Sequence, residues 1–249
     1  MTHRLVRVAH TSKGGVLRAI NMLRLLFGAG AAGVLVLTAP TAHAQPAHQP
    51  QAQPTVVPCS ETALVKAVNA ANAAGEGDLV LAPLCTYKLT SAHSAGGAGS
   101  PAGLPNITAP ITMTGLATEI TRASGAGPFR IIEVDGPSQQ PGAHGQLTLT
   151  AVSVTNGDAG LGVGGGIAAL GGSVTITGGG VHDSEAALGG GIYTDTSLTT
   201  TASSVTDNTA ISDGGGIFRG AGSVTLLSTN VSGNAPNNCA AAPPVSSPC

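Results

Sequence analysis

The hydrophobic positions in the second half of the chain recur in a fixed pattern. A Gly-Gly-Gly-Ile sequence begins at Gly164, Gly189 and Gly214, so successive copies are 25 residues apart. Each isoleucine is followed by two further short apolar stretches, separated by glycine, serine and threonine. The second stretches are Val174–Ile176, Leu198 and Val224–Leu226, and the third are centred on Val181, Val205 and Val231. Three brief strands are therefore predicted for each unit.

This pattern indicates a β-solenoid rather than another repeat fold. A helix pair needs continuous helical periodicity, which the glycine triplets and the Val- and Thr-rich stretches interrupt. A propeller blade needs four strands and about 40 residues. Stacked units instead pair each strand in parallel with its copy, which predicts an inward column of Ile167, Ile192 and Ile217 and a second column of the third-stretch valines. Less regular apolar stretches before residue 155 extend the expected solenoid to about six coils.

The two ends of the repeat region show different patterns. Apolar residues recur at helical spacing between Ser60, a good N-cap residue, and Gly75, a good C-cap residue. This helix and the short strands expected at 78–82 and 86–90 form a predicted N-terminal cap, 59–90, over the exposed strand edges of the first coil. Cys239 lies where a fourth glycine triplet would begin. The repeat is therefore expected to stop there, with residues 239–249 as a C-terminal cap of the 59–249 domain.

The N-terminal segment has the composition of an export signal. Met22 to Ala44 contains one arginine, an apolar run from Leu25 to Leu37 and an Ala-His-Ala end, which is the pattern of a secretory signal peptide. The predicted signal is residues 1–44, with Met22 as an alternative start, and the exported chain is expected to be extracellular with no membrane span. The Pro- and Gln-rich residues 45–58 lack apolar periodicity and are predicted to be a disordered linker.

Composition and charge narrow the classes of partner. Hydrophobic residues make up 42% of the chain, aromatic residues 2% and charged residues 9%, with no tryptophan, so a surface of Ser, Thr, Asn and Gly is expected. Removal of residues 1–44 takes away five basic residues and no acidic one, which leaves five basic against twelve acidic residues and a net charge of −7. Such a chain lacks the positive charge of a nucleic-acid groove.

All four cysteines, Cys59, Cys85, Cys239 and Cys249, lie in the predicted exported part. An even number of cysteines outside the cytoplasm indicates disulfide bonds. Proximity in sequence favours Cys59 with Cys85 and Cys239 with Cys249, one pair near each end of the solenoid, and the other two connectivities stay open at this point. A zinc site is disfavoured because no Cys-x-x-Cys pair or nearby histidine accompanies these residues.

The repeat units read GGGIAALGGSVTIT…VHDS, GGGIYTDTSLTT…VTDN and GGGIFRGAGSVTLL…VSGN. They resemble the repeat of the chlamydial polymorphic outer-membrane proteins, which pairs a GG-aliphatic-Ile motif with an FxxN-like motif. The chain differs from that repeat in its third-stretch valines, where phenylalanine is usual, and in Ser184, where the other units carry Asn208 and Asn234. More widely, residues 59–239 are similar to secreted bacterial proteins of the pectin-lyase-like fold. The resemblance implies an all-β, right-handed parallel β-helix.

That fold is shared with polysaccharide lyases and hydrolases, so chemistry has to be argued from particular residues. Asp183 and Asp207 lie two residues after their third-stretch valines and are predicted to stack about 5 Å apart, as candidate ligands of Ca²⁺ or as solvated turn carboxylates. Arg219 is a candidate contact for an acidic sugar or the partner of a carboxylate. Tyr193 and Phe218 are predicted to form either an outward aromatic ladder for sugar rings or core filling.

Two functional hypotheses follow. The preferred one is a secreted, non-catalytic β-helix module that binds a glycan or a cell surface, with Tyr193, Phe218 and Arg219 as candidate ligand contacts and no catalytic residue or cofactor assigned. The alternative is a small Ca²⁺-assisted lyase of acidic polysaccharide, with Asp183 and Asp207 as metal ligands and Arg219 near the substrate. The positions of these three side chains discriminate between the hypotheses, because the lyase requires them on one side of the solenoid.

Overall fold

The computed structural model describes residues 53–242, which form many strands and the single helix α1 (Glu61–Ala74). Before the repeats the strands are β1 (Thr55–Val57), β2 (Gly77–Leu81), β3 (Thr86–Leu89), β4 (Pro110–Arg122), β5 (Ile132–Asp135) and β6 (Gln146–Thr155). The repeats contain β7 (Ile167–Leu170), β8 (Ser173–Thr177), β9 (Gly180–His182), β10 (Glu185–Leu188), β11 (Ile192–Thr194), β12 (Ser197–Thr201), β13 (Ser204–Thr206), β14 (Thr209–Asp213), β15 (Ile217–Arg219), β16 (Ser223–Leu227), β17 (Asn230–Ser232) and β18 (Cys239–Ala241).

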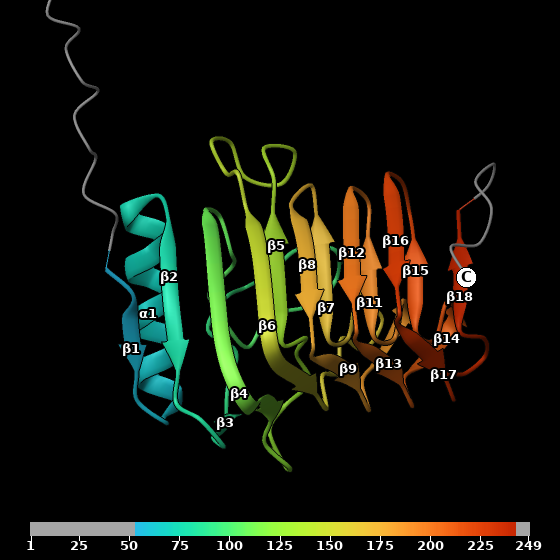
Figure 1. Ribbon diagram of the computed structural model, residues 1–249. Helices are drawn as coiled ribbons and strands as arrows, with labels where there is room; N and C mark the ends of the chain where they lie inside the picture. The colour runs from blue at the N-terminus through green and yellow to red at the C-terminus, as the bar shows by residue number, and fades with distance from the viewer. Residues whose placement is uncertain (1–52, 243–249) are drawn as a thin grey trace, which may run out of the picture. The chain divides into compact units, whose positions relative to one another are not determined.

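These strands stack in parallel, as a solenoid requires. One path of neighbouring strands, here called the long sheet, has the order β1-β2-β4-β6-β8-β12-β16. A five-stranded sheet has the order β5-β7-β11-β15-β18, and the short strands β9, β13 and β17 pair with one another in sequence. Figure 1 shows the strands of each sheet side by side, with the chain advancing steadily from β4 to β18. The expected all-β, parallel, solenoid-like architecture is therefore confirmed.

The predicted inward columns are present in the register. Ile192 pairs with Ile167 on one side and with Ile217 on the other, and all three side chains are fully buried. Val205 similarly pairs with Val181 and Val231. Like residues therefore lie over like residues, and the columns form the hydrophobic core between the sheets.

The glycine triplets stand at the corners that precede the five-stranded sheet. Gly164, Gly189 and Gly214 have φ values of +63°, +62° and +63°, in the left-handed region that favours glycine. At the next position, a Cβ added to Gly190 would lie 2.2 Å from the carbonyl oxygen of Thr209. The corner therefore excludes side chains for two separate reasons, which explains why the triplet recurs in each unit.

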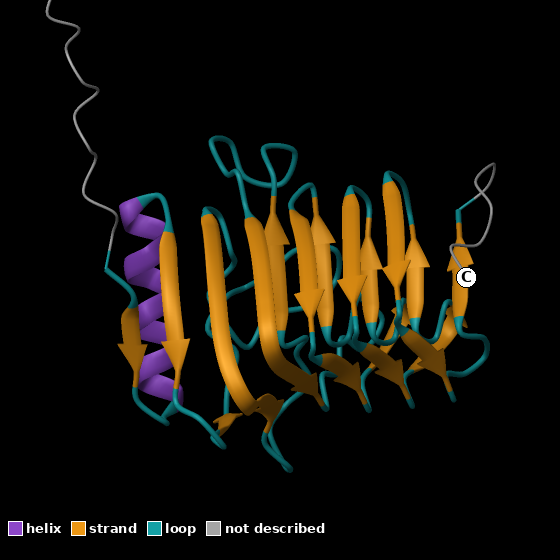
Figure 2. Cartoon of the chain, viewed as in Figure 1, coloured by secondary structure: helices purple, strands orange, loops and turns teal. Residues whose placement is uncertain are grey.

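The N-terminal end is covered by α1, as the sequence predicts. The Ser60 side chain accepts a hydrogen bond from the Ala63 amide, and Gly75 ends the helix at a φ of +84°. The helix buries Leu64, Val68 and Ala71, and Figure 2 shows it lying along β1 and β2 at the end of the long sheet. A disulfide between Cys59 and Cys85 ties the start of the helix to the residue before β3, as proximity suggested.

Two expectations about the ends differ from the structure. The linker was expected to be disordered through residue 58, but Thr55–Val57 is strand β1 and pairs with β2, because β-branched residues favour a strand wherever a free edge is available. Cys239 was expected to start a cap, but it pairs with Ile217 as the first residue of β18. The last repeat is shortened, so Cys239 stands in the isoleucine column and the five-stranded sheet continues for one more strand.

Some expectations fall on residues outside the described range. The signal peptide, the linker before residue 53 and Cys249 belong to this group. Within the described range, Cys239 is disulfide-bonded and no cysteine is free. A search of the same residues finds no helix with the length and apolarity to traverse a bilayer.

Candidate functional site

Asp183 and Asp207 lie at equivalent turns after β9 and β13, whose register pairs His182 with Thr206. Both side chains are exposed, and both residues have left-handed backbone conformations, with φ values of 52° and 58°. Asn156 and Gly233 occupy the same turn in the flanking coils with similar φ values. Aspartate, asparagine and glycine are the residue types that best tolerate this conformation. The turn geometry alone therefore explains the two carboxylates, and residues 53–242 contain no group of three or more metal-ligating acids, histidines or cysteines.

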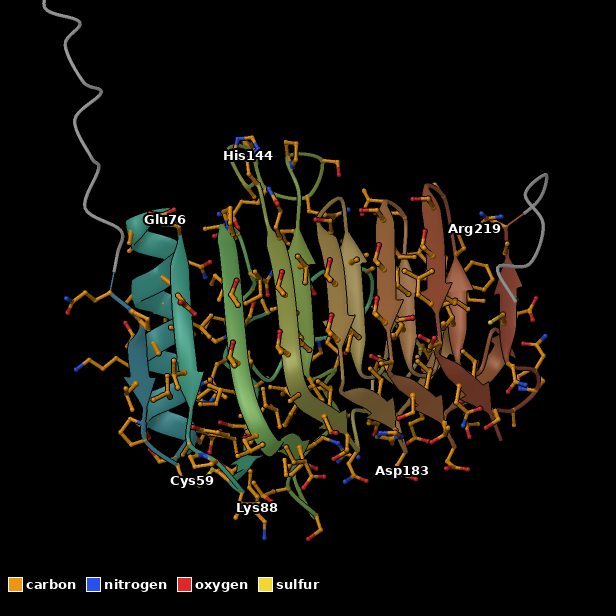
Figure 3. The ribbon with its side chains drawn as sticks, in the orientation of Figure 1. Cys59, Glu76, Lys88, His144, Asp183 and Arg219 are labelled. Atoms are coloured by element: carbon orange, nitrogen blue, oxygen red, sulfur yellow. A yellow bond between two sulfur atoms is a disulfide. The ribbon has the colours of Figure 1, made fainter. Side chains whose placement is uncertain are left out.

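Arg219 lies far from these carboxylates along the strand direction. It ends β15 and pairs in register with Thr194, and Figure 3 shows Arg219 and Asp183 at opposite edges of the sheets. The structure thus does not bring Asp183, Asp207 and Arg219 together. These three side chains therefore do not form the one-sided arrangement that the lyase hypothesis assigned to them.

Tyr193 and Phe218 do form the predicted ladder. Their rings are stacked with centroids 5.8 Å apart and planes 5° apart. They alternate with the buried Ile192 and Ile217, so they lie on the outward side of the five-stranded sheet. Tyr193 is half-buried and Phe218 is only 8% exposed, and burial together with Asp195 raises the pKa of the Tyr193 hydroxyl. Arg219 follows Phe218 directly and therefore points to the other side of the strand.

Asn208 and Asn234 form a hydrogen-bonded stack at a corner. The Asn208 amide nitrogen donates to the carbonyl oxygen of Val181 and to Asn234 Oδ1, each at 3.0 Å, and its Oδ1 accepts from the Ser184 amide at 3.0 Å. Asn234 donates in turn to the Val205 carbonyl. Asn208 is fully buried. These side chains satisfy backbone groups that the turn leaves without partners, and their role is structural.

A buried charged cluster was not predicted from the sequence. Arg130 is 0% exposed and Glu133 is 1% exposed, and Arg130 Nη1 lies 2.9 Å from Glu133 Oε2. The other guanidinium nitrogen donates to the Gly97 carbonyl at 2.8 Å, and the Gly97 amide donates back to Glu133. Asn106 bridges Glu133 and Asp135 through its amide nitrogen. The cluster fastens the irregular segment 94–106 over the start of the five-stranded sheet.

Burial sets the acidity of this cluster. It raises the pKa of Glu133 to about 7, against the opposing effects of the Gly97 amide and the Arg130 charge, while Asp135 raises this pKa further. Burial also lowers the pKa of Arg130, which its two acidic neighbours counteract. Perturbed groups of this kind mark functional sites when they face a cleft. Here both side chains of the ion pair are covered by protein and face no cleft.

A polar hollow of about 260 Å³ lies beside α1. It is lined by Asn69, Asn72, His93, Ser94, Pro105, Asn106, Thr108 and Gln140. Both polar atoms of the Asn72 amide are already used, because it donates to the Asn106 carbonyl at 2.7 Å and accepts from the Thr108 amide at 3.0 Å. This part of the wall is therefore a clamp between α1 and the chain before β4.

The most regular surface of the molecule is the outward side of the long sheet. Each of β4, β6, β8 and β12 contributes a Thr-x-Thr pair, and the register aligns the pairs in two columns. We call this surface the threonine face: Thr112, Thr148, Thr175, Thr199 and Thr225 in one column, and Thr114, Thr150, Thr177 and Thr201 in the other. The alternating residues of the same strands form the core. Figure 3 shows the outward side chains of these strands in rows.

The threonine face is uncharged and open. Its side chains are half-buried or exposed, and no hydrogen bond within residues 53–242 engages their hydroxyl groups. A third outward column consists of Pro110, Gln146, Ser173, Ser197 and Ser223. From β4 to β16 these three columns therefore contain mostly hydroxyl-bearing side chains and no acidic or basic side chain.

Sequence reasoning missed this face although a signal was present. The second strand of each unit reads polar-aliphatic-Thr-x-Thr, as in QLTLT, SVTIT and SLTTT, and the first four residues recur in SVTLL. This recurrence lies in the residues between the apolar positions, whereas the predicted columns depend on the apolar positions alone. Once strands stack in register, a recurrence of this kind places the same side chain at the same point of every coil.

Comparison with protein-family models, curated proteins and solved structures gives no match for this chain. The class of protein is therefore defined by its own fold and surface. It is a parallel, β-solenoid-like protein with columns of outward threonines on one sheet.

Proposed function

We propose that this chain is an exported, non-catalytic binding module that holds an extended ligand against the threonine face. In this proposal residues 1–44 direct export, and the exported chain acts outside the cell. The solenoid is right-handed with about six coils, which agrees with the strong preference of parallel β crossovers for that hand and with the resemblance of its repeats to those of β-helix proteins.

The observation that carries the proposal is the periodicity of the threonine face. A pocket would suit a small ligand, but this surface repeats the same two threonines on successive strands. Strand spacing fixes the repeat at about 4.8 Å in one direction, and residues two apart on a strand give about 6.6 Å in the other. Such a surface is complementary to a ligand that is itself flat and periodic, such as an ordered polymeric glycan or another solid.

Rigidity supports the same conclusion. Threonine is restricted at χ1 because its Cβ is branched, so the hydroxyl and methyl groups lose little freedom on binding. The columns are fixed from below by buried residues such as Leu149 and Ile176, which pair in the same register. The array is thus organised before any ligand arrives.

Co-sedimentation with insoluble periodic solids tests this proposal. The exported chain is mixed with crystalline cellulose, chitin and ice, and the bound fraction is compared with that of a Thr175→Lys/Thr199→Lys variant, which places two charged side chains at the centre of the face. Thr209→Lys is the matched control, because Thr209 is an exposed threonine on β14 outside the face. We expect wild type and Thr209→Lys to bind at least one solid and the double variant to lose that binding.

A second arm separates the threonine face from the aromatic ladder. Tyr193→Ala removes one ring of the stack with Phe218 and leaves the long sheet unchanged. We expect it to bind as wild type does. The proposal is wrong if the exported chain binds none of the solids, or if Tyr193→Ala loses binding while Thr175→Lys/Thr199→Lys retains it.

A further inference from the structure

The two spacings of the threonine face narrow the class of ligand. Along the stack, successive threonines such as Thr148, Thr175 and Thr199 are separated by the distance between parallel strands, about 4.8 Å. Along each strand the paired threonines, such as Thr175 and Thr177, are separated by about 6.6 Å. Oxygen atoms on the prism face of hexagonal ice also repeat on a rectangular grid, with a shorter repeat close to the strand separation and a longer repeat somewhat greater than the spacing along a strand. The face therefore approximates the surface lattice of ice in both directions.

The chemistry of the side chains points in the same direction. Each threonine presents a methyl group beside a hydroxyl group, and water next to an array of this kind is ordered by the methyls and held in place by hydrogen bonds to the hydroxyls. No hydroxyl of the array is engaged by the described chain, so each is available to water. The sequence supplies stiff, β-branched residues at each of these positions, which keeps the spacing regular.

Features typical of sugar recognition are missing from this side of the described chain. The three outward columns, at residues 110–114, 146–150, 173–177, 197–201 and 223–225, carry no aromatic ring and no charged side chain, and Gln146 is their only amide. Protein sites for small ligands usually place a few specific polar groups within an apolar, aromatic-lined cavity. A flat, uniform sheet of hydroxyl and methyl groups is suited instead to a ligand that is the same at every repeat.

We infer that the threonine face binds ice. This inference rests on the proposed function and names its ligand: an ordered layer of water on the face joins the ice lattice, so that the exported chain adsorbs to ice crystals and restrains their growth. The partner is the prism surface of ice, and the contact needs no cofactor.

The test measures growth and recrystallisation of ice in the presence of the purified exported chain. We expect wild type to facet ice crystals and to inhibit recrystallisation, and we expect Thr175→Lys/Thr199→Lys to need at least about tenfold more protein for the same inhibition. Thr209→Lys should act as wild type does. Thermal melting followed by circular dichroism confirms that each variant is folded.

A second variant with smaller changes is used in case the two lysines prevent folding. Thr175→Ser/Thr199→Ser retains both hydroxyls and removes two methyls and the restriction at χ1. Ice binding should weaken in this variant, whereas a glycan held by hydrogen bonds should still be bound. The inference is overturned if wild type leaves ice growth unchanged, or if the lysine variant is folded and inhibits as well as wild type. If wild type binds cellulose or chitin but does not affect ice growth, the inference alone is overturned. If wild type binds none of the solids, the proposed function is overturned as well.

Discussion

Arg130 Nη1 lies 2.9 Å from Glu133 Oε2, and the two side chains are 0% and 1% exposed. This ion pair joins the start of the five-stranded sheet to the segment around Gly97, which accepts from Arg130 and donates to Glu133. A charge buried in this way is costly unless its partner is present. Removal of either partner is therefore expected to destabilise the irregular part of the chain.

Replacement of Arg130 by methionine should leave Glu133 buried without its positive partner. We expect Arg130→Met to lower the free energy of unfolding by about 3–5 kcal/mol at pH 8, where Glu133 is ionised, and by less at pH 5. Urea denaturation at the two values of pH measures this. Arg130→Met/Glu133→Gln is the control and should recover part of the loss, because no unpaired carboxylate remains. Equal effects of the single variant at both values of pH would contradict the prediction.

Glu133 should also make stability depend on pH in a direction opposite to that of most carboxylates. Its folded-state pKa of about 7 exceeds its ordinary value of 4.5, so the folded state binds the proton more tightly than the unfolded state does. The contribution is fully present below about pH 4.5 and is lost as the pH rises through 7, by at most about 1.4 kcal/mol per pH unit. In urea denaturation from pH 4.5 to 8, the stability of wild type relative to Glu133→Gln should therefore fall. Parallel curves for the two proteins would show that Glu133 does not titrate in this range.

The asparagine stack offers a prediction with an internal control. Asn208→Ala removes the bonds to Val181, Ser184 and Asn234 and leaves buried backbone groups without partners. We expect a loss of about 2–4 kcal/mol in the free energy of unfolding, measured by chemical denaturation. Asn208→Ser should lose less, because Ser184 holds the equivalent place one coil earlier and bonds to the Gly157 amide. If both variants are as stable as wild type, the stack does not support the corner.

The Cys59–Cys85 bond closes a loop with a sequence separation of 26 residues that contains α1. Cys59→Ser/Cys85→Ser should lower the free energy of unfolding by about 3–4 kcal/mol, because the unfolded chain regains the freedom that the bond removes. Denaturation of wild type and variant with and without a reductant measures this. Hydrogen exchange should show the loss of protection first in α1. A variant whose α1 amides stay as protected as those of the repeats would contradict the assignment of the bond to this end of the fold.

Several features of the fold could be predicted from the sequence because they depend on local pattern and repetition. The isoleucine and valine columns follow from the spacing of 25 residues, and α1 follows from Ser60, Gly75 and the apolar residues between them. Proximity in sequence was sufficient for the Cys59–Cys85 bond. In each case the interaction partner is a neighbour in sequence or a copy of the same unit.

Other features could not be predicted because they depend on contacts between unlike segments. No local pattern around Arg130 and Glu133 indicates burial, and the path of residues 94–106, which has no periodicity, covers them. Cys239 was placed wrongly because the last unit is shorter than the others, and register in a solenoid is set by pairing rather than by residue count. The threonine face was open to prediction, but only by an analysis that compares the polar positions of successive units.

Because each repeat unit has the same glycine corner and the same strands, the threonine face can be lengthened by adding units. Residues 136–145 form a long irregular connection between β5 and β6, and β6 still pairs in register with β4 and β8. An in-frame duplication of residues 164–188 would add one row of the array and no new kind of side chain. The length of the threonine face is thus set by the number of copies of a short segment. Recombination can change that number in a single event.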